Sequence, residues 1–288
     1  MKLVRFEWKG QIGLGVVSED EQTITDLTQP GVTGVSMTVF LAGGDKTLES
    51  ARAAALQPST EAIPLEEAHL LAPVGDPNKI LCIGQNYRDH CEEQNQPIPD
   101  RAILFSKYST ALNDPGGVIR LLPGVSEQVD YEAELAVVIG GAGGGGRNIP
   151  EAEAMRHVAG YLCANDVTAR DIQFGDKQWV RGKSPDTFFP IGPYLVTADE
   201  IADPHTLDIS LTLNGKIMQR SNTSNLIFRI PFLISYLSQT MTLLPGDILS
   251  TGTPGGVGVF RKPPVFLQPG DTVTVTISGL GNLTNTVA

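Results

Sequence analysis

The sequence predicts an α+β fold in which strands predominate and helices are few. Short β-rich runs recur along most of the chain, whereas only a few segments have a helical pattern. The strands do not alternate regularly with helices, which disfavours a doubly wound parallel sheet. With 288 residues, the chain can form one large domain, or one large and one small domain.

The chain is expected to divide into a small N-terminal α/β module, residues 1–71, and a larger domain, residues 72–288. The boundary is placed at residues 72–78, where two prolines and a glycine interrupt the chain. Within the module, strands are predicted at residues 3–8, 12–17 and 23–27, and an alanine-rich helix at residues 48–56. The first two strands are expected to form a hairpin.

The larger domain is expected to begin with a short buried strand. Strands are predicted at residues 79–84, 130–140, 207–214, 248–250 and 272–278, and helices at residues 88–95, 150–161 and 230–238. A glycine-rich segment at residues 140–146 fits the G-x-G-x-x-G pattern of dinucleotide-binding loops. However, Pro150 rather than the last glycine is placed to open the next helix, so a flexible turn is the favoured interpretation.

Composition and charge argue against several classes of protein. The apolar fraction of 41% and the charged fraction of 18% are typical of a folded protein. The net charge is −11 and no basic run offsets it, which argues against nucleic-acid or anionic-membrane partners. No apolar run reaches transmembrane length. The three cysteines form no Cys-x-x-Cys pair, so we expect a reduced, cytoplasmic setting without disulfides or a zinc site.

Acidic residues stand out in the predicted strand DYEAELAVVIG at residues 130–140. At a period of two, Glu132 and Glu134 share one face with Asp130, although the strand becomes apolar on both faces toward its C-terminal end. Buried carboxylates must be neutralised, protonated or held by a cation because their desolvation is costly. Two interpretations remain open: the start of a hard-metal site, or an edge strand with one solvated face.

Asp166 is a candidate third carboxylate for such a site. Three carboxylate ligands without histidine or cysteine suit Mg²⁺ or Mn²⁺ better than Zn²⁺. The alternative is that Asp166 serves only as a helix cap or turn residue.

His90 and Glu93 are candidates for acid–base chemistry. If residues 88–95 are helical, the two side chains share a face, and the carboxylate can orient the imidazole. Such a dyad can take a proton from water or from a carbon acid. The alternative is a solvated helix with incidental charges. The remaining histidines are expected to be structural: His69, His157 and His205.

Lys183 and Gln173 are candidates for binding negative charge. Lys183 lies in a segment rich in tight-turn residues, where it could hold a carboxylate or an enolate. Gln173 could donate a hydrogen bond to the same oxygen. The alternative places both on the surface.

Five motifs together resemble the fumarylacetoacetate hydrolase superfamily. They are IGQNYRDH at residues 83–90, DYEAEL at 130–135, NDVTARD at 165–171, GKS at 182–184 and TGTPGGVG at 251–258. They occur in the family's order and at its spacing, and the resemblance covers about residues 72–288. The first 70 residues look like the extra module of the longer bacterial members and of the domain-containing-protein-2 branch.

The resemblance implies a mainly-β, mixed β-roll for the larger domain, usually within a homodimer. It also implies that Mg²⁺ or Mn²⁺ is held by the acids matching Glu132, Glu134 and Asp166, with Asp130 outside the metal site.

The resemblance further implies roles for residues around the metal. His90 and Glu93 match a dyad that activates water or transfers a proton, on a short helix that orders over bound ligand. Lys183 and Gln173 match residues that stabilise an enolate or oxyanion. Arg170 and Thr253 match residues that line the substrate pocket.

The expected substrate is a small 2-oxo or 1,3-diketo acid, and the first expectation is hydrolysis of a C–C bond in an acylpyruvate-like or fumarylpyruvate-like compound. The second expectation is an oxaloacetate decarboxylase or tautomerase, or a 2-hydroxyhepta-2,4-diene-1,7-dioate isomerase. The contrasting class is a metabolite-binding protein that retains the fold without catalysis.

Overall fold

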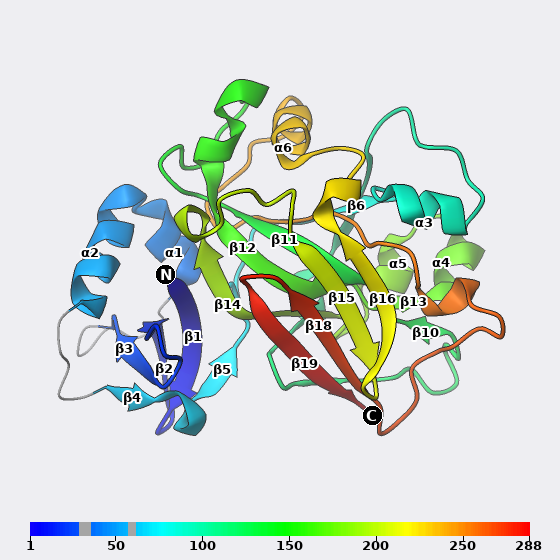
Figure 1. Cartoon of the computed structure of the whole chain (residues 1–288), viewed down its shortest axis with the longest axis horizontal. Helices are drawn as coiled ribbons and strands as arrows, with labels where there is room; N and C mark the ends of the chain where they lie inside the picture. The colour runs from blue at the N-terminus through cyan, green and yellow to red at the C-terminus, as the bar shows by residue number, and fades with distance from the viewer. Residues whose placement is uncertain (29–35, 57–61) are drawn as a thin grey trace.

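Two large β-sheets dominate the part of the chain that the structure describes (Figure 1). The computed structural model describes residues 1–28, 36–56 and 62–288. Within these residues, a twelve-stranded mixed sheet packs against a five-stranded sheet, and the helices are short. The predicted α+β, mainly-β class is therefore confirmed.

The N-terminal part contains the predicted hairpin and third strand. Its elements are β1 (Lys2–Trp8), β2 (Gln11–Val17), β3 (Thr23–Asp26), α1 (Met37–Ala42), α2 (Asp45–Ala55), β4 (Ile63–Pro64) and β5 (His69–Leu71). The predicted helix is present as α2, which begins three residues earlier than expected. Asp45 in the first turn and Arg52 in the last suit the helix dipole.

The larger part contains most of the two sheets. Its strands are β6 (Ile80–Gly84), β7 (Ile103–Lys107), β8 (Leu112–Asn113), β9 (Val118–Ile119), β10 (Val129–Asp130), β11 (Ala133–Ile139), β12 (Val158–Asn165), β13 (Thr168–Ala169), β14 (Phe189–Thr197), β15 (Asp208–Leu213), β16 (Lys216–Asn222), β17 (Ile248–Ser250), β18 (Thr272–Ile277) and β19 (Gly281–Val287). Its helices are α3 (Arg88–Glu93), α4 (Arg170–Asp176), α5 (Val180–Lys183) and α6 (Ile230–Ser238). No described helix is long and apolar enough to cross a bilayer.

The large sheet runs through both parts of the chain. Its main order is β4-β3-β2-β1-β14-β12-β11-β17-β6-β7, and β1 joins β14 through the pairs Lys2↔Val196 and Leu3↔Leu195. The N-terminal strands therefore extend the sheet that also contains β11; in Figure 1, β1 is dark blue and β14 is yellow-green.

The predicted helix at residues 150–161 is wrong in its second half. Glu151–His157 forms a 3₁₀ helix, and β12 begins at Val158. β12 pairs with β11 on one side and β14 on the other, and all of its residues are buried. An apolar run of this length fits a helix or a buried strand equally well, and the two neighbouring strands decide the outcome.

The predicted strand at residues 130–140 is divided in two. Asp130 ends β10, which pairs with β13, and β11 starts only at Ala133. β11 lies between β12 and β17 and is buried throughout, so the edge-strand interpretation is wrong. The glycine-rich segment after it forms a turn closed by the Gly140↔Gly144 bridge, as predicted.

Alternate residues of β11 enter two different cores. Leu135, Val137 and Ile139 belong to the core shared with the five-stranded sheet and α6. Ala136 and Val138 pack on the other face, in the core that includes residues of α1 and α2. Because both faces are covered, the acids at the start of β11 are held in a buried position.

Candidate active site

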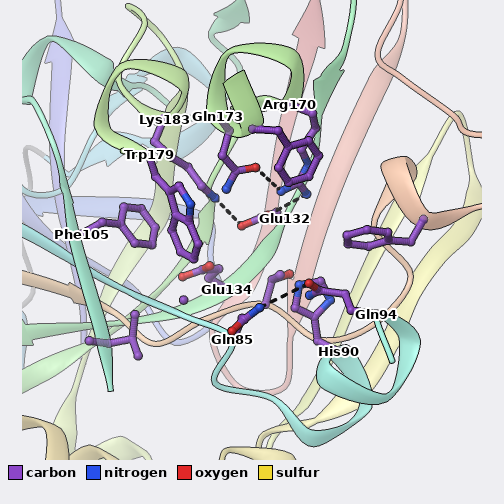
Figure 2. A pocket seen from close by; sticks show the side chains of 15 residues that line it. Gln85, His90, Gln94, Phe105, Glu132, Glu134, Arg170, Gln173, Trp179 and Lys183 are labelled. Carbon is purple, nitrogen blue, oxygen red and sulfur yellow. Dashed lines mark hydrogen bonds and ion pairs between the residues drawn. The ribbon is translucent and has the colours of Figure 1, made fainter. Parts of the chain in front are cut away.

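A cavity of about 180 Å³ lies where α3, α4, α5, the start of β11 and the loop after β17 meet (Figure 2). It is lined by Ile83, Gly84, Gln85, His90, Gln94, Phe105, Glu132, Glu134, Arg170, Gln173, Phe174, Trp179, Lys183, Thr253 and Phe260. The lining therefore includes most of the predicted site residues. The two others lie directly behind it: Glu93 contacts His90, and Asp166 contacts Lys183.

Three buried carboxylates form a cluster at one side of this cavity. Glu132, Glu134 and Asp166 each offer an oxygen, and these oxygens lie within 4.8 Å of one another. The pairing of β11 with β12 brings them together, because Ala133 is opposite Asn165. Asp166 N–H also donates to the Glu132 carbonyl at 2.9 Å. Asp166 is thus part of the acidic cluster and not merely a turn residue.

Buried cations surround Glu132. Lys183 Nζ donates to Glu132 Oε2 at 2.7 Å and to Asp166 Oδ2 at 2.6 Å, and Arg170 Nη2 lies 2.7 Å from Glu132 Oε1. Although burial acts in the opposite direction, Lys183 and Arg170 lower the pKa of Glu132 to about 2. For Lys183, burial lowers the pKa, but the charges of Asp166 and Glu132 outweigh burial and raise the pKa overall. Both groups are charged at neutral pH.

In the described part of the chain, no lysine or arginine forms an ion pair with Glu134. Its Oε2 accepts hydrogen bonds from the Ser250 hydroxyl and from Gly252 N–H at 3.0 Å. Burial, followed by the charges of Asp166 and Glu132, raises the pKa of Glu134 well above its ordinary value. The charged form of this carboxylate therefore lacks the compensation that Glu132 receives.

The donor set and the charge balance both fit a hard divalent cation. Among the described residues around the cavity, four buried carboxylates face three buried cations; the carboxylates are Asp130, Glu132, Glu134 and Asp166, and the cations are Lys107, Arg170 and Lys183. Oxygen-only ligands suit Mg²⁺ or Mn²⁺. A divalent ion would leave the site net positive, which suits an anionic ligand.

Two buried residues of this site were not predicted to take part in it. Lys107 Nζ donates to Asp166 Oδ1 at 2.6 Å and to the Val167 carbonyl at 3.1 Å. Its only signal is a lysine at the end of the apolar run ILFSK. Asp130 lies outside the cluster of possible metal ligands, as expected, but it accepts hydrogen bonds from Arg170 Nε and Gly258 N–H, both at 2.8 Å. It therefore anchors Arg170.

His90 and Glu93 form the predicted pair on α3. His90 Nδ1 lies 3.3 Å from Glu93 Oε2, and Gly256 N–H donates to both Glu93 oxygens at 3.0 Å. His90 is 6% exposed and therefore does not lie on a solvated helix face, whereas the Glu93 side chain keeps 22% of its surface exposed. Figure 2 shows Glu132 and Glu134 between His90 on one side and Lys183 on the other.

The other histidines have structural contacts or lie on the surface. His157 Nδ1 contacts the Gly144 carbonyl at 3.0 Å, and His205 Nε2 accepts from Ile230 N–H at 3.2 Å at the start of α6. His69 is exposed on β5. The contacts of His157 and His205 agree with the structural roles expected for them, whereas the structural role expected for His69 stays a prediction.

Polar and aromatic side chains complete the cavity. Arg170 Nη1 donates to Gln173 Oε1 at 3.1 Å, and Thr253 Oγ1 accepts from Gln219 Nε2 at 2.8 Å. The buried positions of Lys183 and Gln173 overturn the alternative of two surface residues. The aromatic rings that line the cavity are those of Phe105, Phe174, Trp179 and Phe260.

Comparisons with known proteins agree with this architecture. The family described as fumarylacetoacetate (FAA) hydrolase C-terminal matches residues 79–288, and the family described as Rv2993c-like, N-terminal, matches residues 1–73. The bovine mitochondrial protein named oxaloacetate tautomerase FAHD2A is 47% identical over 100% of this chain and 91% of its own length.

Two solved structures extend the likeness to the fold. The fumarylacetoacetate hydrolase of Exiguobacterium antarcticum is 36% identical with a TM-score of 0.85, and the alignment covers 100% of this chain and 99% of that one. The maleylpyruvate hydrolase of Sphingobium sp. SYK-6 is 34% identical with a TM-score of 0.81, at the same coverage. Motifs, fold and full-length identity agree, and the chain belongs to the fumarylacetoacetate hydrolase family.

Proposed function

We propose that this protein is a divalent-metal-dependent oxaloacetate keto–enol tautomerase. The observation that carries the proposal is the 47% identity, over the whole chain, to a protein named as an oxaloacetate tautomerase. The site supports it, because an acid–base pair, a carboxylate cluster and two buried cations border one cavity. The first expectation from the sequence, C–C hydrolysis, stays a prediction, and the solved hydrolases keep it as the main competitor.

We assign Glu132, Glu134 and Asp166 as the residues that hold Mg²⁺ or Mn²⁺. When bound there, the cation would supply Lewis-acid stabilisation of negative charge on a 2-oxo group. Lys183 and Lys107 keep the Asp166 carboxylate ordered from two sides, since each of its oxygens accepts a hydrogen bond from one lysine.

His90 is assigned as the group that moves a proton to and from C3 of the substrate. When Nδ1 carries the ring proton, it donates to Glu93, and Nε2 is then free to accept a proton. Gly256 N–H fixes the Glu93 carboxylate, which orients the ring. Tautomerisation needs this one proton taken from carbon and one delivered to the 2-oxo oxygen.

Lys183 and Gln173 are assigned to the developing enolate oxygen. Lys183 is buried and charged, so it can donate to that oxygen without water screening it. Gln173 is positioned by Arg170, whose Nη1 donates to its Oε1, and its amide N–H groups are therefore free to act as donors. Arg170 and Thr253 are assigned to substrate carboxylate oxygens.

The proposal is tested by following the ultraviolet absorbance of the oxaloacetate enol as it converts to the keto form. With Mg²⁺ or Mn²⁺ present, the protein should accelerate the conversion, and chelator treatment or Glu132→Ala should abolish the acceleration. Pyruvate release and acetylpyruvate cleavage are measured in parallel. Faster cleavage of acetylpyruvate than tautomerisation of oxaloacetate would establish the hydrolase instead, and turnover of neither would favour the non-catalytic class.

Three further expectations stay predictions. They are a homodimer, a cytoplasmic location and a domain boundary between residues 71 and 72. The bovine relative is named as mitochondrial, whereas the location predicted for this protein is cytoplasmic.

A further inference from the structure

Gln219 is a buried amide outside the cavity lining that connects two parts of the site. It lies on β16 with 1% of its surface exposed. Its Oε1 accepts from Ala133 N–H at 2.8 Å, between Glu132 and Glu134 in the chain. Its Nε2 donates to Thr253 Oγ1 and to the Pro254 carbonyl, both at 2.8 Å. The side chain therefore fastens the loop of Thr253 to the start of β11.

The chemistry of the neighbours fixes the orientation of this amide. A backbone N–H can only donate and a backbone carbonyl can only accept, so the amide oxygen must face Ala133 and the amide nitrogen must face Pro254. The reversed amide would place donor against donor and acceptor against acceptor. Consequently, the contact between Gln219 and Thr253 has one direction: the amide donates and the hydroxyl oxygen accepts.

This direction decides what the Thr253 hydroxyl can do next. A threonine hydroxyl has one proton and two lone pairs. Because one lone pair of Thr253 Oγ1 accepts from Gln219, the proton cannot point at Gln219 and must be donated in another direction. Among the described residues, no side chain or carbonyl accepts a hydrogen bond from Thr253 Oγ1, and Thr253 lines the cavity. A nearly buried donor without a protein acceptor costs free energy until an acceptor reaches it, and the acceptor of a ligand in the cavity can do so.

We propose that Gln219 is a positioning residue that forces Thr253 to act as a hydrogen-bond donor, and so selects a substrate with a carboxylate or oxo oxygen at that position. The inference rests on the proposed function, which supplies the anionic substrate. Gln219 touches no ligand itself. It affects substrate binding by setting the direction in which the Thr253 hydroxyl donates its proton.

The kinetic test uses the full-length, metal-loaded protein with Gln219→Glu and Gln219→Met. In Gln219→Glu, the new carboxylate still accepts from Ala133 N–H. It also offers the Thr253 hydroxyl an acceptor, so the hydroxyl proton turns away from the cavity. KM for oxaloacetate should rise by about tenfold, with kcat changed by less than about threefold. Gln219→Met removes the donor without adding an acceptor, so it should raise KM by a smaller factor.

Double variants that combine each Gln219 substitution with Thr253→Val show whether the change in KM requires the Thr253 hydroxyl or comes from a general disturbance of the site. In that background, Gln219→Glu should change KM by less than about twofold, because no hydroxyl remains to be reversed. An increase in KM that persists there would overturn the proposal, as would an unchanged KM for Gln219→Glu alone. If Gln219→Glu does not fold, as judged from its melting temperature, Gln219→Met is compared in the two backgrounds by the same criterion.

A neutron structure of the deuterated, unliganded protein tests the proposal without any substrate. The deuterium on Thr253 Oγ1 should point into the cavity, and both deuterons on Gln219 Nε2 should point to Thr253 and Pro254. A Thr253 deuterium directed at Gln219 or at a backbone carbonyl would overturn it. Failure of the wild-type protein to interconvert oxaloacetate would instead count against the proposed function alone.

Discussion

Glu132 and Glu134 lie two residues apart and meet opposite electrostatic surroundings. Lys183 and Arg170 compensate the burial of Glu132 and lower its pKa to about 2. Among the described residues, the donors to the Glu134 carboxylate are the neutral Ser250 hydroxyl and Gly252 N–H, and burial together with its acidic neighbours raises its pKa. A divalent cation at the cluster would supply the positive charge that the buried Glu134 carboxylate lacks in its surroundings. A carboxylate in this position therefore suits a function in cation binding better than it suits the stability of the metal-free fold.

Glu134→Gln should therefore stabilise the metal-free protein at neutral pH. A carboxyl whose folded pKa lies above its ordinary value of 4.5 favours folding below that value, and the advantage declines as the pH rises. The amide keeps an acceptor for Ser250 and Gly252 and carries no charge. In chelator at pH 8, its melting temperature should exceed that of the wild type by at least about 2 °C, with a smaller difference at pH 5. A variant that is less stable at both pH values would contradict the charge argument.

His90→Ala should separate catalysis from metal binding. Removal of a positioned acid–base group lowers the rate by about 10²- to 10⁴-fold, whereas the dissociation constant for Mn²⁺ should stay within about twofold because His90 is not assigned as a ligand. Enzyme rates and calorimetric titration measure the two effects. The matched control is His69→Ala, on the exposed part of β5, which should leave both unchanged. Parallel loss of activity and Mn²⁺ affinity would show that the role of His90 is misassigned.

At the scale of elements, β12 shows which interactions determine the fold around the site. It places Asn165 and Asp166 beside β11, and its other edge pairs with β14. β12 and β14 approach closely at Gly160, where an added Cβ would lie 2.2 Å from the Val196 carbonyl oxygen. A side chain at this position cannot be accommodated without moving the backbone.

Gly160→Ala should destabilise the protein by about 1 to 3 kcal/mol, because the methyl group overlaps a backbone atom that cannot rotate away. The matched control is Gly175→Ala on α4, where no atom lies within 4 Å of the added Cβ. This change should stabilise the helix by about 0.5 to 1 kcal/mol. Denaturant unfolding measures both. Equal stability of the two variants would show that β12 and β14 tolerate a wider spacing than the structure has.

Local patterns in the sequence predict the elements whose own residues decide their structure. The β1–β2 hairpin follows from turn residues, α6 from apolar periodicity, and the carboxylate pair of Glu132 and Glu134 from a two-residue spacing. The helix predicted at residues 150–161 fails because strand pairing, which involves residues far apart in the chain, overrides an ambiguous apolar run.

The site shows the same division between local and distant information. The motifs point to His90, Glu132 and Asp166, and the structure brings these side chains together. Lys107 and Gln219 escape prediction because each acts through a partner more than 30 residues away, Asp166 and Thr253 respectively. A lone lysine or glutamine in a strand carries no signal of such a contact.

At the scale of the molecule, the large sheet connects the N-terminal strands to the site. β1 pairs with β14, and β14 pairs with β12, whose end carries the residues next to Asp166. The acidic surface, with a net charge of −11, does not attract an anionic substrate over long distances. If the proposed function holds, capture of a keto diacid would depend on the local positive charge of Arg170, Lys183 and the proposed cation.

The most direct test of the central claim is deuterium exchange at C3 of oxaloacetate, followed by proton NMR in D₂O. With Mg²⁺, the protein should accelerate the loss of the C3 proton signal while oxaloacetate remains intact, and His90→Ala or a chelator should remove the acceleration. Abstraction of the C3 proton by His90 requires this result. Pyruvate formation at the same rate as the loss of the C3 signal, or an exchange rate equal to that without protein, would contradict the account.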